Sequence, residues 1–300
     1  MSTAVAIGAV ERDTGLSKDT LRVWERRYNF PQPSRDAFGE RLYPAEQIDK
    51  LRAIKRLMDQ GLRPGKIVHH SLDELMHLGR PPAAAAETAA PAELGALMDM
   101  IRQHETDALR RAMGQTVLKH GLAHFVLNLV APLNAMVGDA WIAGRLEVFE
   151  EHLYTEVLQG VLRNAIATVP RHAGSPRVLL TTLPQEEHGL GLLMAEALLT
   201  LDGAHCVSLG VATPVADIVR AAASQRTDIV ALSFSGAYPA NQVLAGLTQL
   251  RSVLPAAVEL WAGGAAASML RRPPECVCIL PSLAAIQETL SVWRARRLHA

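Results

Sequence analysis

Residues 178–191 read VLLTTLPQEEHGLG, and this stretch decides the fold of the chain around it. Its first five residues, 178–182, are apolar or β-branched and predict a buried strand. The loop 183–191 carries two acidic residues, a histidine and two glycines, and an apolar helical run follows at 190–201. A strand, a short polar loop and a helix together predict a βα unit.

The same alternation continues to the end of the chain. Further strands are predicted at 204–209, 228–234, 257–262 and 277–280, and helices at 214–224, 241–254 and 282–297. Strands that alternate with helices of this length indicate a parallel, doubly wound sheet. Because ligands of such sheets bind beyond the carboxyl ends of the strands, the candidate binding loops are 183–191, 210–213, 233–240 and 263–265.

The composition indicates a globular chain with an uneven charge distribution. Of the 300 residues, 49% are hydrophobic and 20% are charged, which excludes disorder throughout and favours more than one domain. Basic and acidic residues number 30 each, so the overall charge gives no sign of a nucleic-acid partner. Residues 1–66, however, contain 13 basic and 9 acidic side chains, whereas the rest contains 17 and 21. This asymmetry predicts a basic interaction module at the N-terminus.

The number of cysteines and the hydropathy of the chain indicate in which cellular compartment the protein is expected. Cys206, Cys276 and Cys278 are too few for a disulfide framework, and the last two lack the second pair of a zinc site. We find no N-terminal signal segment and no run of 18 apolar residues. The sequence therefore predicts a cytoplasmic protein without a membrane partner.

Two boundaries divide the chain into three predicted domains. Residues 79–91 are rich in Pro and Ala and lack large apolar side chains, which is typical of a linker. A second group of Pro, Gly and Ser lies at 170–176. The segment 92–170 shows helical apolar spacing and predicts a helical bundle. We expect a head at 1–78, the bundle at 92–170 and an α/β domain at 171–300.

The head has the pattern of a helix-turn-helix. A short helix from Ile7, a turn at Gly15 and a second helix capped by Ser17 follow one another. The second helix has an apolar face and, on another face, a basic stripe. This pattern favours a helix that enters the major groove of DNA, and the alternative is an amphipathic helix whose basic face is only solvated. The apolar face contains Leu21, Trp24 and Tyr28, and the basic stripe contains Lys18, Arg22 and Arg26, with Arg27 beside it.

The head resembles the DNA-binding domain of the MerR family over residues 5–75. The resemblance is carried by WERRY at 24–28, PQPSR at 31–35, GERLY at 39–43 and the apolar spacing of the helix that follows. It implies a winged helix-turn-helix with a wing at 35–43, bound to double-stranded DNA. Phosphate contacts position such a protein, whereas base contacts specify the sequence. The resemblance implies base contacts from Arg22 and Arg26, with Lys18 beside them, and backbone contacts from Arg27, Arg35, Arg41 and Tyr43.

The loop after the first strand admits two cofactor interpretations. Gly189-x-Gly191 is compatible with a dinucleotide-binding turn, but Met194 stands where the third glycine belongs. The other interpretation uses the histidine, since Glu186-x-His188-x-x-Gly191 resembles the D-x-H-x-x-G signature of cobalamin-binding domains. It implies that His188 is the lower axial ligand of cobalt and that Glu186 fixes its tautomer. Gly191 then leaves room for the nucleotide tail of the cofactor.

Two further loops extend this resemblance. Ser233-x-Ser235 stands where cobalamin-binding domains have S-x-L, so Ser235 replaces the leucine. Gly263-Gly264 matches the paired glycines of the next loop. Both pairs follow predicted strands and are therefore assigned to the cofactor site.

The helical segment resembles the cap that covers the upper face of cobalamin. Trp141 is followed ten residues later by Glu151-His152, the spacing found in such caps. The resemblance implies that Trp141 contacts the upper axial group, that Glu151 lies near that face and that His152 is a second candidate cobalt ligand.

The order of head, cap and α/β domain resembles the CarH/LitR family of light-responsive repressors. It implies a cobalamin-dependent regulator that uses adenosylcobalamin, binds operator DNA and assembles as a tetramer when loaded. Ile142 departs from the family, whose light-sensing members have a histidine directly after the tryptophan. This favours an alternative, a cobalamin sensor that does not respond to light. Two others are a corrinoid enzyme subunit and a regulator whose α/β domain binds another ligand or a protein.

Overall fold

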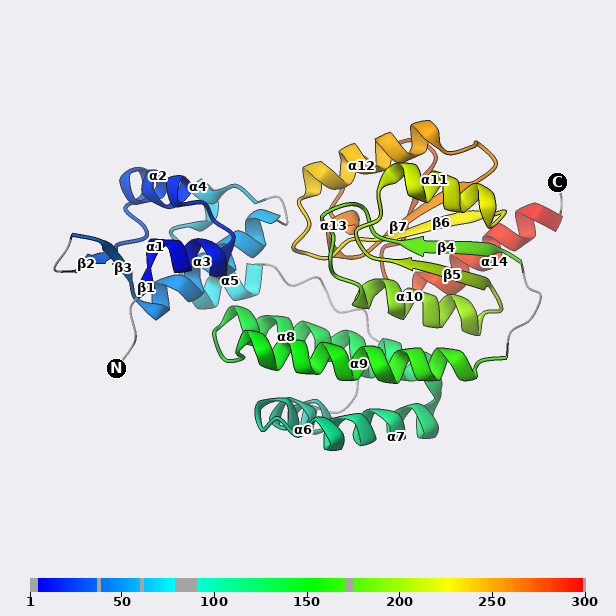
Figure 1. Cartoon of the computed structure of the whole chain (residues 1–300), viewed down its shortest axis with the longest axis horizontal. Coiled ribbons are helices and arrows are strands. Elements are labelled where there is room, and N and C mark those ends of the chain that lie inside the picture. The colour runs from blue at the N-terminus through cyan, green and yellow to red at the C-terminus, as the bar shows by residue number, and fades with distance from the viewer. Residues whose placement is uncertain (1–4, 37–38, 60–61, 79–90, 171–174, 299–300) are drawn as a thin grey trace. The chain divides into compact units, whose positions relative to one another are not determined.

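The computed structural model describes residues 5–36, 39–59, 62–78, 91–170 and 175–298 (Figure 1). The chain divides into two compact units. The first contains residues 1–84 together with 136–147, and the second contains 85–135 together with 148–300. The predicted linker 79–91 lies outside the described residues except for Pro91, where a helix begins.

The head is a winged helix-turn-helix, as predicted. Gly15, in the left-handed conformation with φ +67°, ends the first helix, and the Ser17 side chain caps the second by accepting the N–H of Thr20. A small antiparallel sheet in the order β1-β3-β2 forms the wing. The elements are β1 (Val5–Ala6), α1 (Ile7–Thr14), α2 (Lys18–Tyr28), β2 (Ser34–Arg35), β3 (Arg41–Tyr43), α3 (Ala45–Asp59), α4 (Pro64–Ile67) and α5 (Leu72–Leu78).

The segment predicted to be a bundle is helical. Its elements are α6 (Pro91–Arg102), α7 (Thr106–His124), the π-helix η1 (Phe125–Val130), α8 (Ala131–Ile142) and α9 (Val148–Thr168). Gly121, with φ +82° and ψ 165°, interrupts α7 shortly before η1, a break that the apolar spacing did not predict. The stretch Thr106–Trp141 is apolar and long enough to cross a membrane by composition and length. This is weak evidence for a span, because a core helix has the same composition; Leu109, Met113 and Phe125 are buried here.

The C-terminal domain has the predicted doubly wound sheet. Its five strands are parallel, in the order β5-β4-β6-β7-β8. Helices α10 and α14 cover one face, and α11 and α12 cover the other (Figure 1). The elements are β4 (Arg177–Thr181), α10 (Leu190–Leu201), β5 (His205–Gly210), α11 (Val215–Ser224), β6 (Ile229–Ser233), α12 (Ala240–Val253), β7 (Glu259–Gly263), α13 (Ala265–Ser268), β8 (Val277–Ile279) and α14 (Ala285–Leu298).

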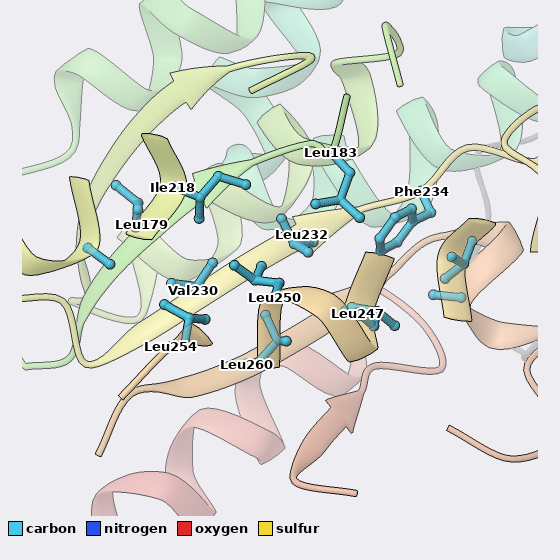
Figure 2. Packing of buried hydrophobic residues seen from close by; sticks show 14 of the residues in the cluster. Leu179, Leu183, Ile218, Val230, Leu232, Phe234, Leu247, Leu250, Leu254 and Leu260 are labelled. Atoms are coloured by element: carbon cyan, nitrogen blue, oxygen red, sulfur yellow. The ribbon is translucent and has the colours of Figure 1, made fainter. Parts of the chain in front are cut away.

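A continuous apolar core holds one face of the sheet against its helices. Figure 2 shows side chains of β4, β6 and β7 meeting those of α11 and α12. Each fully buried leucine in such a core contributes about 1.5–3 kcal/mol through removal of its apolar surface from water. The labelled members are Leu179, Leu183, Ile218, Val230, Leu232, Phe234, Leu247, Leu250, Leu254 and Leu260.

Candidate functional site

The strand order places a topological switch point between β4 and β6. β4 pairs with β5 on one side and with β6 on the other, so the chain leaves β4 and β6 in opposite directions across the sheet. Such a point opens a crevice at the carboxyl ends of the strands. The loops after β4 and β6 contain Glu186, His188 and Ser235, so three of the predicted site residues lie at this crevice.

Hydrogen bonds join these three side chains. Oε1 of Glu186 accepts from Nδ1 of His188 at 2.7 Å and from the His188 backbone N–H at 3.0 Å. Oε2 accepts from the backbone N–H of Ser235 at 2.8 Å and from the Ser235 hydroxyl at 2.9 Å. Ser235, which replaces the leucine of the S-x-L pattern, therefore holds the carboxylate that holds the histidine.

The Glu186 carboxylate is fully buried, with 1% of the residue exposed. Burial alone raises the pKa of a carboxyl group, but the hydrogen bonds from His188 and Ser235 outweigh it, and the pKa of Glu186 lies below its ordinary value. The hydrogen bond to Glu186 raises the pKa of His188 against the effect of burial. The Glu151 carboxylate also raises the pKa of His188, which places Glu151 within electrostatic reach of the site.

The arrangement leaves one ring nitrogen of His188 available. A carboxylate only accepts hydrogen bonds, so Nδ1 carries the proton and Nε2 of the neutral ring carries the lone pair. The His188 side chain is 64% exposed, although its partner is buried. A single oriented imidazole suits a metal that brings its remaining ligands with it, as cobalt does in a corrin ring.

Thr182 and Tyr238, which the sequence analysis did not single out, hold the loop after β4. The Thr182 hydroxyl donates to the Glu186 carbonyl at 2.6 Å and accepts the N–H of Ala212 at 2.7 Å. The hydroxyl of Tyr238 donates to the Pro184 carbonyl at 3.1 Å. The signal for Thr182 was present in the sequence, because a polar pair ends the otherwise apolar strand 178–182.

Two of the three predicted glycines, Gly191 and Gly264, lie where side chains do not fit. A Cβ on Gly191 would lie 2.6 Å from Oγ of Ser233, which is itself buried. A Cβ on Gly264 would lie 2.2 Å from the Phe234 carbonyl oxygen, and Gly264 has φ +96°. Gly263 is less restricted, since its nearest neighbour would be Cβ of Leu280 at 3.6 Å.

A cavity of about 190 Å³ lies beside the histidine. It is lined by residues of the loops after β4 and β6: Gln185, Glu186, His188, Ala237, Tyr238, Pro239 and Gln242. The oriented histidine and the two glycines without room for a side chain suit a corrin cofactor held at this edge of the sheet.

The predicted cap residues have different environments. Glu151 accepts a hydrogen bond from the Thr155 hydroxyl at 2.7 Å, and the His152 side chain is 70% exposed. Trp141 is half-buried and packs against the hydrophobic cluster of the head, within the first unit. The predicted contact of Trp141 with an upper axial group stays a prediction.

The basic stripe of the head is exposed on α2. Lys18, Arg22, Arg26 and Arg27 all lie at the surface, as does Arg35 in the wing. Arg22 pairs with Asp19 at 3.2 Å, and the guanidinium of Arg27 lies 5.3 Å from the ring centre of Tyr28. These contacts leave the arginines on a face that DNA is able to reach.

The wing pairs Arg41 with α2 and buries Tyr43. Nε of Arg41 donates to the Glu25 carboxylate at 2.8 Å, which ties the wing to α2. Tyr43 is completely buried, and its hydroxyl has no hydrogen-bond partner among the residues that the structure describes. The predicted phosphate contact of Tyr43 stays a prediction, because the structure shows only that the side chain is buried. Its ring belongs to the core because β3 is the central strand of the wing sheet.

Comparison with known families gives one match in the head and one in the helical segment α6–α9, and both matches end before the loops that carry Glu186, His188 and Ser235. Residues 5–71 match the family described as MerR HTH family regulatory protein. Residues 94–165 match the family described as B12 binding domain. One part of the chain is thus similar to MerR-type DNA-binding heads and another to B12 binding domains, a combination that indicates a cobalamin-binding transcription regulator.

Individual relatives are similar to the chain over most of their length. The chain is homologous to the HTH-type transcriptional repressor CarH of Myxococcus xanthus, with 29% identity over 271 residues, 88% of each chain. It is likewise 29% identical over 230 residues to the repressor CarA of that organism, 76% of this chain and 75% of CarA. The monomethylamine corrinoid protein of Methanosarcina barkeri shares the fold, with 17% identity and a TM-score of 0.52, over 67% of this chain and 98% of that one.

Proposed function

We propose that this protein is a cytoplasmic repressor that binds adenosylcobalamin and changes its assembly on operator DNA in response to light. The observation that carries the proposal is the buried Glu186 carboxylate, which orients His188 while leaving Nε2 available. In this proposal His188 would ligate the cobalt, and the cofactor would be held by the residues Glu186, Gly191, Ser233, Ser235, Gly263 and Gly264. Glu151, His152 and Trp141 belong to its upper face.

The chain's own residues define what this site does. Ser235 and the His188 backbone keep Glu186 ionised, and Glu186 keeps the proton of His188 on Nδ1. Gly191 and Gly264 keep the edge of the sheet free of side chains. When bound, adenosylcobalamin supplies a cobalt–carbon bond that light breaks.

Oligomerisation explains how a small head binds its operator tightly. One helix-turn-helix contacts few bases, whereas joining several heads raises their effective concentration on DNA. We therefore propose that the loaded form is a homo-oligomer, a tetramer by resemblance. Illumination of the loaded form would then loosen the assembly and release DNA.

The test uses full-length protein loaded with adenosylcobalamin in darkness, measured by absorption, gel filtration and gel shift on its own promoter DNA before and after illumination. We expect the dark form to be larger and to bind DNA more tightly. Ile142→His should retain more cofactor through gel filtration after illumination than the wild type, because imidazole is able to ligate cobalt and isoleucine is not. A protein that takes up no cobalamin contradicts the proposed cofactor. A loaded assembly indifferent to light favours the alternative suggested by Ile142, a cobalamin sensor that is not a photoreceptor.

The roles of the arginines in the head are tested by comparing affinity with salt dependence. Arg22→Ala or Arg26→Ala should cost about 1–3 kcal/mol on the operator and relax the sequence preference. Arg41→Ala should weaken binding to all sequences and reduce the slope of log affinity against log salt by about one. Arg220→Ala, an exposed arginine on α11, is the matched control and should change neither quantity. An altered sequence preference with an unchanged salt slope in Arg41→Ala contradicts these roles.

A further inference from the structure

The turn between α8 and α9 belongs to the same compact unit as the head. Gly144 ends α8 in the left-handed conformation, with φ +64°. Its N–H donates to the Trp141 carbonyl at 3.0 Å, and the N–H of Arg145 donates to the Ala140 carbonyl at 2.8 Å. These paired bonds form a Schellman motif, which gives the turn one defined shape.

The backbone of this turn lies directly against an ion-pair cluster on the head. A Cβ on Gly144 would lie 2.8 Å from Oδ1 of Asp49 and 3.3 Å from Nη1 of Arg52, so the turn lies in close contact with the tips of these two side chains. Arg52 pairs with Asp49 at 2.9 Å and with Asp13 at 2.7 Å, which links α3 to α1 at this position. The turn therefore meets a part of the head that is itself held rigidly.

An apolar contact accompanies the polar one. Trp141, in the last turn of α8, packs against the cluster that forms the core of the head. The members of that cluster include Leu51 and Ile54, both fully buried on α3. A half-buried tryptophan contributes a large apolar surface, so Trp141 anchors the turn against the head.

The contact does not cover the DNA-binding face. Lys18, Arg22 and Arg26 are exposed while Trp141 and Gly144 are in place. Docking of the turn therefore does not block access of DNA to α2. Its effect is to hold the head in one orientation on the α8–α9 turn.

We propose that the α8–α9 turn is a reversible latch on the head, and that Trp141 is its shared anchor. This inference rests on the proposed function, in which the same tryptophan contacts the upper group of the cofactor. One indole ring does not occupy both places at once, so cofactor binding and head docking compete for Trp141. By thermodynamic linkage, whatever stabilises the latch must weaken cobalamin binding by the same factor, and cobalamin must open the latch.

The test closes the latch covalently in the full-length protein, with Asp49→Cys and Gly144→Cys combined. Cγ of Asp49, where the new sulfur would lie, is 3.3 Å from the Cβ position on Gly144. Because an S–S bond is about 2.05 Å long, a sulfur carried on that Cβ is able to reach the sulfur at the Cγ position of Asp49. The chain also has three native free cysteines, Cys206, Cys276 and Cys278. Each single-cysteine variant is therefore the matched control, because it reports any disulfide that an introduced cysteine forms with a native one.

We expect the disulfide to form in cofactor-free protein and to form more slowly when adenosylcobalamin is added in darkness. The oxidised double variant should bind adenosylcobalamin at least roughly 5-fold more weakly than its reduced form, the lower end of typical coupling between sites. Failure of the cofactor-free double variant to cross-link overturns the docked turn. Cross-linking and affinity that are both independent of the cofactor overturn the competition. If the wild type takes up no cobalamin, the proposed function fails, and the cross-link still reports whether the turn docks.

Discussion

His188→Ala should abolish most cobalamin binding. The substitution removes the one imidazole that Glu186 orients and leaves a buried carboxylate with one fewer hydrogen bond. Loss of a residue that merely supports a metal ligand typically costs roughly 10–100-fold in affinity, and loss of the ligand itself should cost no less. The measurement is a titration with adenosylcobalamin in darkness, followed by absorption, in which any residual complex should lack the spectrum of histidine ligation.

The matched control for this variant is His120→Ala. His120 is an exposed histidine on α7, so its loss removes the same group without touching the switch point between β4 and β6. Circular dichroism establishes whether His188→Ala is folded. A folded His188→Ala protein with the affinity and spectrum of the wild type would falsify the ligand assignment.

Gly264→Ala should strongly destabilise the α/β domain, although it adds only one methyl group. The new Cβ would lie 2.2 Å from the Phe234 carbonyl oxygen, and the neighbouring atoms are backbone that cannot rotate away. Gly264 also has φ +96°, which L side chains adopt only under strain. Clash and strain together should lower the free energy of unfolding by about 3 kcal/mol or more.

Gly263→Ala provides the control for this prediction. It adds the same methyl group to the preceding residue, where the nearest atom would be Cβ of Leu280 at 3.6 Å, an ordinary contact. We expect a change in unfolding free energy of less than about 1 kcal/mol. Urea denaturation of both variants measures the difference, and equal stabilities would show that the loop after β7 relaxes more readily than its geometry indicates.

Local sequence patterns predicted most of the secondary structure. The run predicted as a helix over 190–201 is α10 (Leu190–Leu201), and Ser17 caps α2 as its position suggested. These features depend on residues within a few positions of one another, so apolar periodicity and capping preferences predict them directly. The break at Gly121 was not predicted, because an isolated glycine in an apolar helical pattern is usually tolerated.

The candidate site was determined only in part by the sequence. The spacing of Glu186 and His188 within one loop predicted their pairing, since two residues on a short turn are neighbours wherever the turn lies. Ser235 is 49 residues further along the chain, and it meets Glu186 only because β6 is placed beside β4 in the sheet. Strand order is a property of the whole domain, so no local pattern contains it.

The sequence by itself therefore determined which segments form helices and strands, the basic stripe on α2, and the pairing of His188 with Glu186 in the loop after β4. Only the tertiary structure decided that Tyr43 is buried, that Ser235 holds Glu186, and that Trp141 packs against the head. The physical reason is the same in each case. Burial and long-range hydrogen bonds depend on which surfaces meet when the elements pack. That arrangement is the one that buries the most apolar surface of the whole domain, so it does not follow from any local segment.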